Sequence, residues 1–150
     1  MQTVEFGHKK YDAPLFEPHI TLLGNIILPQ EEIIEKAHRL AKLLRPFEAE
    51  LGEIDISSTY WQSVFVRIKG SASLIDAYFK ATEVFSKENE VFMPHMSLVY
   101  GDFDARTRAE IARQIRIPKL KFEVSKLIVT PATSDPQEWV HIEEFELGSV

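Results

Sequence analysis

The sequence predicts an α+β protein made of two similar halves, and two observations support this prediction. The first is a pair of nearly identical pentapeptides, PHITL at 18–22 and PHMSL at 94–98. The second is that each copy is followed by a helical pattern and then by two runs rich in aromatic and β-branched residues. Each half is therefore expected to contain a His-bearing strand, a helix and two more strands, with a pseudo-two-fold axis relating the halves.

In the first half, apolar residues recur at helical spacing between Pro29 and Pro46. Proline fits the first turn of a helix but cannot continue one, so these two prolines predict where the helix begins and ends. The segments 47–57 and 60–70 alternate in part and carry many aromatic and β-branched residues, which predicts two strands.

In the second half, the segment 102–118 predicts a helix capped by Asp104 and ended by Pro118. The segments 119–131 and 137–148 then predict two strands. Another amphipathic helix, at 71–89, lies between the halves and precedes the second His-bearing strand. Only 17 residues precede Pro18, so the matching strand and helix at the start of the first half are expected to be shortened, with 4–6 as a remnant strand. We expect one domain, 1–150, with lobes at about 17–70 and 71–150.

Composition narrows the class of protein. With 45% hydrophobic and 27% charged residues, the chain has the composition of a globular domain and not of a disordered one. The sequence has neither an apolar run of membrane-spanning length nor the pattern of a secretory signal, and it contains no Cys, so we expect a cytoplasmic protein without disulfides. A net charge of −6 argues against a long nucleic-acid interface, although it allows a small anionic ligand.

The two pentapeptides share a His two residues before a hydroxyl residue: His19 with Thr21, and His95 with Ser97. A single His on an apolar strand is most often structural. Here, however, the match includes a preceding proline and recurs in the corresponding place of the other half. Side chains i and i+2 of a strand share a face, so each His is expected to lie beside its hydroxyl. If the halves are related by a two-fold axis, the two pairs can converge.

Two imidazoles and two hydroxyls suit chemistry at a phosphate. One His can take a proton from water while the other gives a proton to the departing oxygen, and the hydroxyls can hold the non-bridging oxygens. Histidine serves both roles because its ordinary pKa lies near neutrality. This arrangement requires no metal or other cofactor. A zinc site at His19 and His95 is a weaker alternative, because no third ligand with suitable spacing accompanies them.

These motifs resemble those of the 2H phosphoesterase superfamily, which has two His-x-Thr/Ser motifs on a duplicated α+β fold. The segments FEPHITLLG (16–24), YWQSVFV (60–66) and MPHMSLVYGD (93–102) look most like its cyclic phosphodiesterases of tRNA-splicing by-product metabolism. The resemblance implies two antiparallel sheets that line a central groove, with helices outside. It also implies that His19 and His95 are the acid/base pair, that Thr21 and Ser97 hold phosphate, and that Tyr100 lines the binding site.

Several other residues have two interpretations. Tyr60 and Trp61 are expected on opposite faces of one strand, so that at most one of them can stack on a nucleotide, and packing of both is the alternative. Trp139 is expected in the core. Arg67 and Lys69 end a strand and fit a solvated surface better than a pyrophosphate site. The arginines of the 102–118 helix fit a solvated face better than a nucleic-acid stripe; they are Arg106, Arg108, Arg113 and Arg116.

The resemblance implies a metal-independent hydrolase that opens ADP-ribose 1″,2″-cyclic phosphate to the 1″-phosphate and nucleoside 2′,3′-cyclic phosphates to 2′-phosphates. We expect a monomer that binds small nucleotides and neither long nucleic acid nor membrane. One alternative is an RNA-end processing or 2′-5′ RNA ligase-like enzyme. Another, from a different class, is a non-catalytic module that binds a nucleotide or phosphate.

Overall fold

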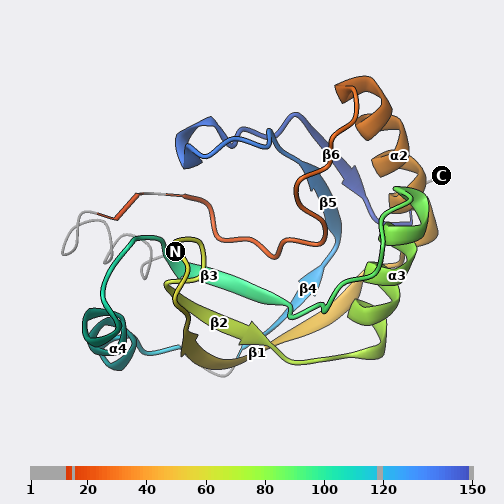
Figure 1. Ribbon diagram of the computed structural model, residues 1–150. Coiled ribbons are helices and arrows are strands. Elements are labelled where there is room, and N and C mark those ends of the chain that lie inside the picture. Colours follow the sequence, from red (N-terminus) through yellow and green to blue (C-terminus); the bar gives the residue numbers. More distant parts are fainter. Residues whose placement is uncertain (1–12, 15, 118–119, 149–150) are drawn as a thin grey trace. The chain divides into compact units, whose positions relative to one another are not determined.

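The computed structural model describes residues 13–14, 16–117 and 120–148 and confirms the α+β class (Figure 1). The predicted remnant strand at 4–6 and the predicted stop at Pro118 lie outside the described residues. The described elements, in chain order, are α2 (Gln30–Leu43), β1 (Phe47–Ile56), β2 (Val64–Ile68), α3 (Ala72–Val84), β3 (His95–Val99), α4 (Ala105–Gln114), β4 (Lys121–Val124), β5 (Lys126–Val129), a 3-10 helix (Pro136–Glu138) and β6 (Glu143–Glu146).

The helices begin where the sequence predicts. Pro29 directly precedes α2, which ends three residues before Pro46. Asp104 caps α4 by accepting a hydrogen bond of 2.7 Å from the backbone nitrogen of Thr107, which confirms the predicted cap. Ser71 caps α3 in the same way. None of the described helices is long and apolar enough to cross a membrane.

The chain forms two compact units, each built from three stretches of sequence. The first unit contains the described part of Met1–Thr21 together with Glu50–Lys69 and Met93–Leu120, and the second contains the rest of the described chain. Each unit takes segments from both halves of the sequence, so the units do not coincide with lobes at 17–70 and 71–150. Both predicted motifs, from His19 to Thr21 and from His95 to Ser97, belong to the first unit.

The first unit is organised around β2, which pairs antiparallel with β1 on one side and with β3 on the other (Figure 1). Buried residues of β2 and β3, such as Val64, Val66 and Leu98, form its core with Ile111 of α4. A bulge interrupts the pairing of β1 near Gly52, where a β-carbon would come within 3.0 Å of the carbonyl oxygen of Arg67. This sheet provides the support for β3, the strand that carries the second motif.

In the second unit, α2 packs against α3 and against β5 and β6. Small residues at the helix contact, Ala37, Ala41, Ala77 and Ala81, are almost fully buried and let the helices approach closely. None of the candidate catalytic residues lies in this unit.

Two strand predictions are wrong in detail. The run 119–131 is divided into β4, which joins the sheet of β1, and β5, which pairs with β6 in a separate sheet. The break falls at Ser125, whose carbonyl oxygen accepts a hydrogen bond of 2.9 Å from the nitrogen of Leu147. The run 137–148 begins in the 3-10 helix, and only Glu143–Glu146 forms a strand. Local alternation did not reveal these changes of partner, because pairing depends on distant residues.

Candidate active site

The two His-x-Ser/Thr segments lie side by side in the first unit. Ile20 forms an isolated antiparallel bridge with Met96, at the centre of β3. Met96 also pairs with Val66 of β2. Because a residue in a sheet has one neighbour on each side, Ile20 and β2 flank β3 on opposite sides. The first motif was predicted to be a full strand, and this is wrong: of its residues only Ile20 makes a strand-like pair.

The bridge determines which side chains face each other. In an antiparallel pair, the residues on either side of a bridge oppose one another in reverse order. His19 is therefore opposite Ser97, and Thr21 is opposite His95. Side chains alternate along each segment, so these four share the face away from Ile20 and Met96. The bridge thus sets the two predicted motifs side by side and is the centre of a local two-fold arrangement.

Both imidazoles are held by the same contact. Nδ1 of His19 lies 2.8 Å from the carbonyl oxygen of Glu17, and Nδ1 of His95 lies 3.0 Å from that of Met93. In each case the carbonyl belongs to the residue two positions earlier. A carbonyl oxygen can only accept, so Nδ1 must carry the hydrogen in both rings. The other nitrogen, Nε2, is then the atom through which each ring can exchange a proton at the site.

The surroundings of the two rings differ. His19 is exposed, whereas His95 is half-buried and contacts the Phe65 ring edge-on at 5.4 Å between centroids. The side-chain amide nitrogen of Gln62 lies 3.3 Å from Nε2 of His95. With its hydrogen on Nδ1, the neutral His95 ring accepts this hydrogen bond at Nε2. The sequence analysis missed Gln62, whose position next to the aromatic pair in YWQSVFV was the available signal.

The two hydroxyls also differ. Thr21 is exposed, whereas Ser97 is buried and its Oγ donates a hydrogen bond of 2.8 Å to the carbonyl oxygen of Trp61. The hydroxyl of Tyr100 is hydrogen-bonded to Ser97 as well. Ser97 has one hydrogen, and it goes to the Trp61 carbonyl. Ser97 must therefore release the Trp61 carbonyl before it can donate to a phosphate oxygen.

An aromatic cluster adjoins these residues. Tyr60 and Trp61 are each 38% exposed, and their rings lie 6.3 Å and 5.0 Å from that of buried Tyr100. Phe16 stacks on Tyr100 at 4.1 Å. Burial, the main cause, raises the pKa of Tyr100 to about 12. Burial therefore favours the neutral phenol of Tyr100 over the phenolate.

Tyr60 and Trp61 lie in the turn before β2 and not on a strand, so that prediction is wrong. Their carbonyls bond to the backbone nitrogen of Gly101, at 3.1 Å, and to Ser97, and not to a neighbouring strand. The argument that their side chains must point to opposite faces therefore no longer applies.

A comparison with family models decides the relationship of this chain to known proteins. Residues 2–133 match the model of the 2′-5′ RNA ligase superfamily. The chain belongs to the 2′-5′ RNA ligase superfamily. This superfamily comprises the 2H phosphoesterases, so the resemblance in the sequence is confirmed, and with it phosphoesterase or RNA ligase-like chemistry at the level of the family.

Several solved structures have a similar fold. TT0787 of Thermus thermophilus is 21% identical, with a TM-score of 0.61 over 98% of this chain and 90% of that one. E. coli LigT complexed with 3′-AMP is 15% identical, with a TM-score of 0.63 over 99% and 91%. A structure described as a phosphoesterase is 14% identical, with a TM-score of 0.59 over 99% and 92%. At these identities the likeness establishes the fold alone. No curated protein matches the chain.

The remaining candidate residues of this superfamily member, Arg67, Lys69 and Trp139, have structural contacts. Arg67 forms an ion pair of 2.7 Å with Asp55, and Lys69 forms one of 3.0 Å with Glu50, in agreement with a solvated strand end. Trp139 is half-buried beside the 3-10 helix, so its predicted place in the core is wrong. Within the described ranges no group of three or more His, Asp or Glu side chains could hold a metal ion.

The prediction of a solvated face for the four arginines of the 102–118 segment, of which Arg116 lies beyond the end of α4, is confirmed for three of them and wrong for the fourth. Arg106, Arg113 and Arg116 are exposed. Arg108 is only 3% exposed and points into the first unit. Its guanidinium donates to backbone carbonyl groups, and these hydrogen bonds take the place of those that a surface arginine would make with water.

Proposed function

We propose that this member of the superfamily is a metal-independent cyclic phosphodiesterase that acts on small cyclic phosphate esters. The expected reactions convert ADP-ribose 1″,2″-cyclic phosphate to ADP-ribose 1″-phosphate and nucleoside 2′,3′-cyclic phosphates to 2′-phosphates. The observation that supports this most is the equivalent hydrogen bond at Nδ1 of His19 and His95, on the shared face of the Ile20–Met96 bridge. Two imidazoles held in the same way can exchange roles as acid and base.

In the proposed reaction, Nε2 of one imidazole takes a proton from water as the water oxygen attacks phosphorus. A new phosphorus–oxygen bond forms, and the bond to one ring oxygen of the ester breaks. Nε2 of the other imidazole, which starts protonated, gives its proton to that departing oxygen. Thr21 and Ser97 donate hydrogen bonds to the non-bridging oxygens, where charge increases in the transition state. Each turnover adds one water to the ester and exchanges the protonation states of the two rings.

A nucleotide-sized substrate fits the surroundings of this site. The half-exposed rings of Tyr60 and Trp61 could stack on a base, which is worth about 1–3 kcal/mol per base in other proteins. A solved relative, E. coli LigT, is described in complex with a mononucleotide, 3′-AMP. The net charge of −6 disfavours a long polymer. We further propose that the protein works as a cytoplasmic monomer.

A second candidate function is RNA-end processing or 2′-5′ ligation, which the name of the superfamily favours. Ligation uses the same proton transfers, but a hydroxyl of a second RNA end replaces water as the nucleophile. A non-catalytic phosphate-binding module is the alternative from another class. Two imidazoles held alike through Nδ1 favour turnover over binding alone, because binding would need only the hydroxyls and a cation.

A product assay separates these functions. The protein is incubated with ADP-ribose 1″,2″-cyclic phosphate, with the four nucleoside 2′,3′-cyclic phosphates, and with short RNAs that carry a 2′,3′-cyclic phosphate or a 5′-hydroxyl end. Each substrate is tested with and without a chelator. We expect hydrolysis of the small esters at a rate that the chelator leaves unchanged. Loss of activity with chelator contradicts the metal-independent mechanism, joined RNA supports ligation, and binding without any product supports the module.

A further inference from the structure

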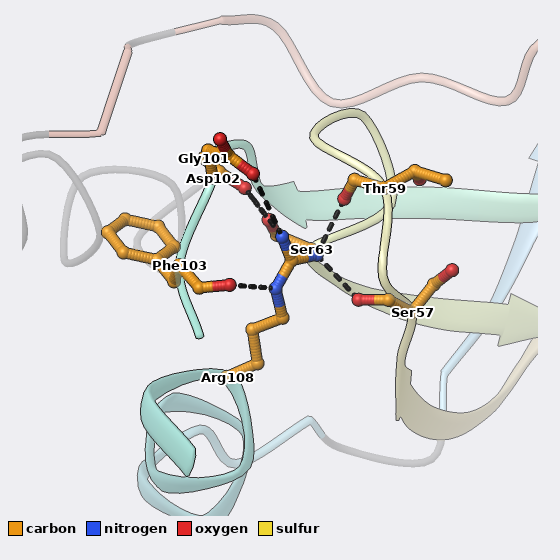
Figure 2. A network of polar contacts seen from close by, with 7 residues as sticks. All are labelled: Ser57, Thr59, Ser63, Gly101, Asp102, Phe103 and Arg108. Atoms are coloured by element: carbon orange, nitrogen blue, oxygen red, sulfur yellow. Dashed lines mark hydrogen bonds and ion pairs between the residues drawn. The ribbon is translucent and has the colours of Figure 1, made fainter. Parts of the chain in front are cut away.

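Arg108 is a buried cation with an unusual set of partners (Figure 2). Its Nε donates to the carbonyl oxygen of Phe103 at 2.6 Å. One terminal nitrogen, Nη1, donates to the carbonyl oxygens of Ser57 and Thr59 at 2.5 Å and 2.6 Å. The other, Nη2, reaches the carbonyl oxygen of Gly101 at 3.3 Å. Backbone carbonyls thus bind all three nitrogens of the guanidinium.

A carboxylate contributes little to this site. Among the described residues, the acidic partner of Arg108 is Asp102, at 3.9 Å, and the side chain of Asp102 is 93% exposed. An ion pair with an exposed partner at this distance contributes little to stability, because water screens the attraction. Hydrogen bonds to the carbonyl dipoles therefore provide most of the compensation for the buried charge. This requires the planar fork of arginine, which spreads five donors over three nitrogens, whereas the three donors of lysine share one nitrogen and cannot span four separated carbonyls.

The four carbonyls belong to two segments that are far apart in the sequence. One is the turn 57–63, between β1 and β2, and the other is the turn 101–103, between β3 and α4. Ser63, which is fully buried, also donates from its Oγ to the carbonyl oxygen of Gly101 (Figure 2). Arg108 therefore joins the two turns and anchors them to α4.

Other residues of these turns contact the candidate catalytic residues. The turn 57–63 provides the Trp61 carbonyl that accepts from Ser97, and it provides the Gln62 amide at Nε2 of His95. The nitrogen of Gly101 donates to the carbonyl oxygen of Tyr60 at 3.1 Å, next to Tyr100. A displacement of the turn 57–63 would therefore reach His95 and Ser97 directly.

We infer that Arg108 is a positioning residue that holds the turn 57–63 against His95 and Ser97. The kinetic part of this inference rests on the proposed function, whereas the structural part can be tested without turnover. Loss of the guanidinium fork would release Gln62 and Trp61 and so change the surroundings of His95, while the second unit stays as it is.

The structural test uses Arg108→Lys, which keeps the charge and most of the stem, and Arg108→Met, which removes the charge. Arg113→Met is the matched control, because it removes an exposed arginine from the same helix. All variants carry Trp139→Phe, which leaves Trp61 as the one tryptophan of the chain. We expect red-shifted Trp61 emission with stronger acrylamide quenching, and a shifted NMR signal of the His95 ring. The signals of His38 and His141, in the second unit, should not move.

The kinetic test measures hydrolysis of a nucleoside 2′,3′-cyclic phosphate by the same variants. We expect kcat to fall on the order of 10²-fold, as for a misplacement of about 1 Å, with a smaller change in KM. A cooperatively folded Arg108→Lys protein with unchanged Trp61 and His95 signals would overturn the inference, as would failure of both Arg108 variants to fold. If the wild-type protein shows no turnover, the proposed function fails while the fluorescence and NMR results still decide the role of Arg108.

Discussion

Ile20 and Met96 pair as an isolated antiparallel bridge, and this contact between two apolar residues arranges four polar side chains around it. The pairing sets His19 opposite Ser97 and Thr21 opposite His95. Because side chains alternate along a strand, a slip of one residue would turn the histidine of one segment to the other face. The register of this pair is therefore as important to the site as the identity of the motif residues.

The two histidines are expected to be equally necessary for turnover. His19→Ala and His95→Ala should each lower kcat at least about 10²-fold, because each removes one partner of an acid/base pair. Steady-state hydrolysis of a 2′,3′-cyclic nucleotide measures the loss. His141→Ala is the matched control, since this His is exposed and lies in the second unit. Full activity of either motif variant contradicts the paired mechanism.

The sequence was sufficient to predict the elements that depend on local chemistry. Neighbouring residues in the sequence determine the start of α2 after Pro29, the Asp104 cap of α4 and the strand β3. The paired motifs also indicated the correct superfamily, because repetition reveals a relationship between distant segments without a structure. The expectation that they converge rested on the period of a strand together with a two-fold relation between the halves.

Features that depend on distant partners were not predictable in the same way. Residues 60–63 were predicted to begin a strand, but they belong to the turn 57–63, where Arg108, Ser97 and Gly101 take the carbonyls that a strand would use. Arg108 itself was interpreted as a surface charge. Its position three residues before buried Ile111 and seven before buried Ile115 places it on the inner stripe of α4, and this spacing was the signal for its burial.

The two motif hydroxyls are expected to differ in their effect on stability. Ser97→Ala leaves the Trp61 carbonyl and the Tyr100 hydroxyl without their buried partner, which should lower the free energy of unfolding by about 1–3 kcal/mol. Thr21→Ala removes an exposed hydroxyl and should change it by less than about 0.5 kcal/mol. Both should reduce kcat. Urea unfolding and steady-state kinetics measure the two effects, and equal losses of stability would argue against the different environments.

Asp104 is expected to make the stability of α4 sensitive to acid. The hydrogen bond from the backbone nitrogen of Thr107 holds the pKa of the Asp104 carboxyl below its ordinary value. A carboxyl with a lowered pKa in the folded state stabilises the fold above its unfolded pKa, and this contribution is lost as the pH falls through the folded pKa. Asp104→Asn keeps a capping oxygen without the charge.

The measurement is the difference in unfolding free energy between the wild type and Asp104→Asn at about pH 7 and about pH 2. We expect any advantage of the aspartate at neutral pH to shrink in acid. Glu110→Gln, an exposed change on the same helix, serves as the control for a carboxylate outside the cap. A difference that is the same at both pH values rules out this role for the charge.

Tyr100 is expected to make the stability of the fold sensitive to alkali, as Asp104 makes it sensitive to acid. Burial raises its pKa from the ordinary 10 to about 12, so the folded state favours the neutral phenol more than the unfolded chain does. This contribution is fully present below the unfolded pKa and is lost as the pH rises through the folded value.

Tyr100→Phe lacks the ionisable group but also loses the hydrogen bond to Ser97. The variant should therefore be less stable near neutrality, by about 1 kcal/mol. The difference from the wild type should shrink above about pH 10 and reverse its sign before about pH 12. Urea unfolding across that range measures the difference, in which the ionisations common to both proteins cancel. A constant difference would mean that Tyr100 ionises as readily in the folded protein as in the unfolded chain.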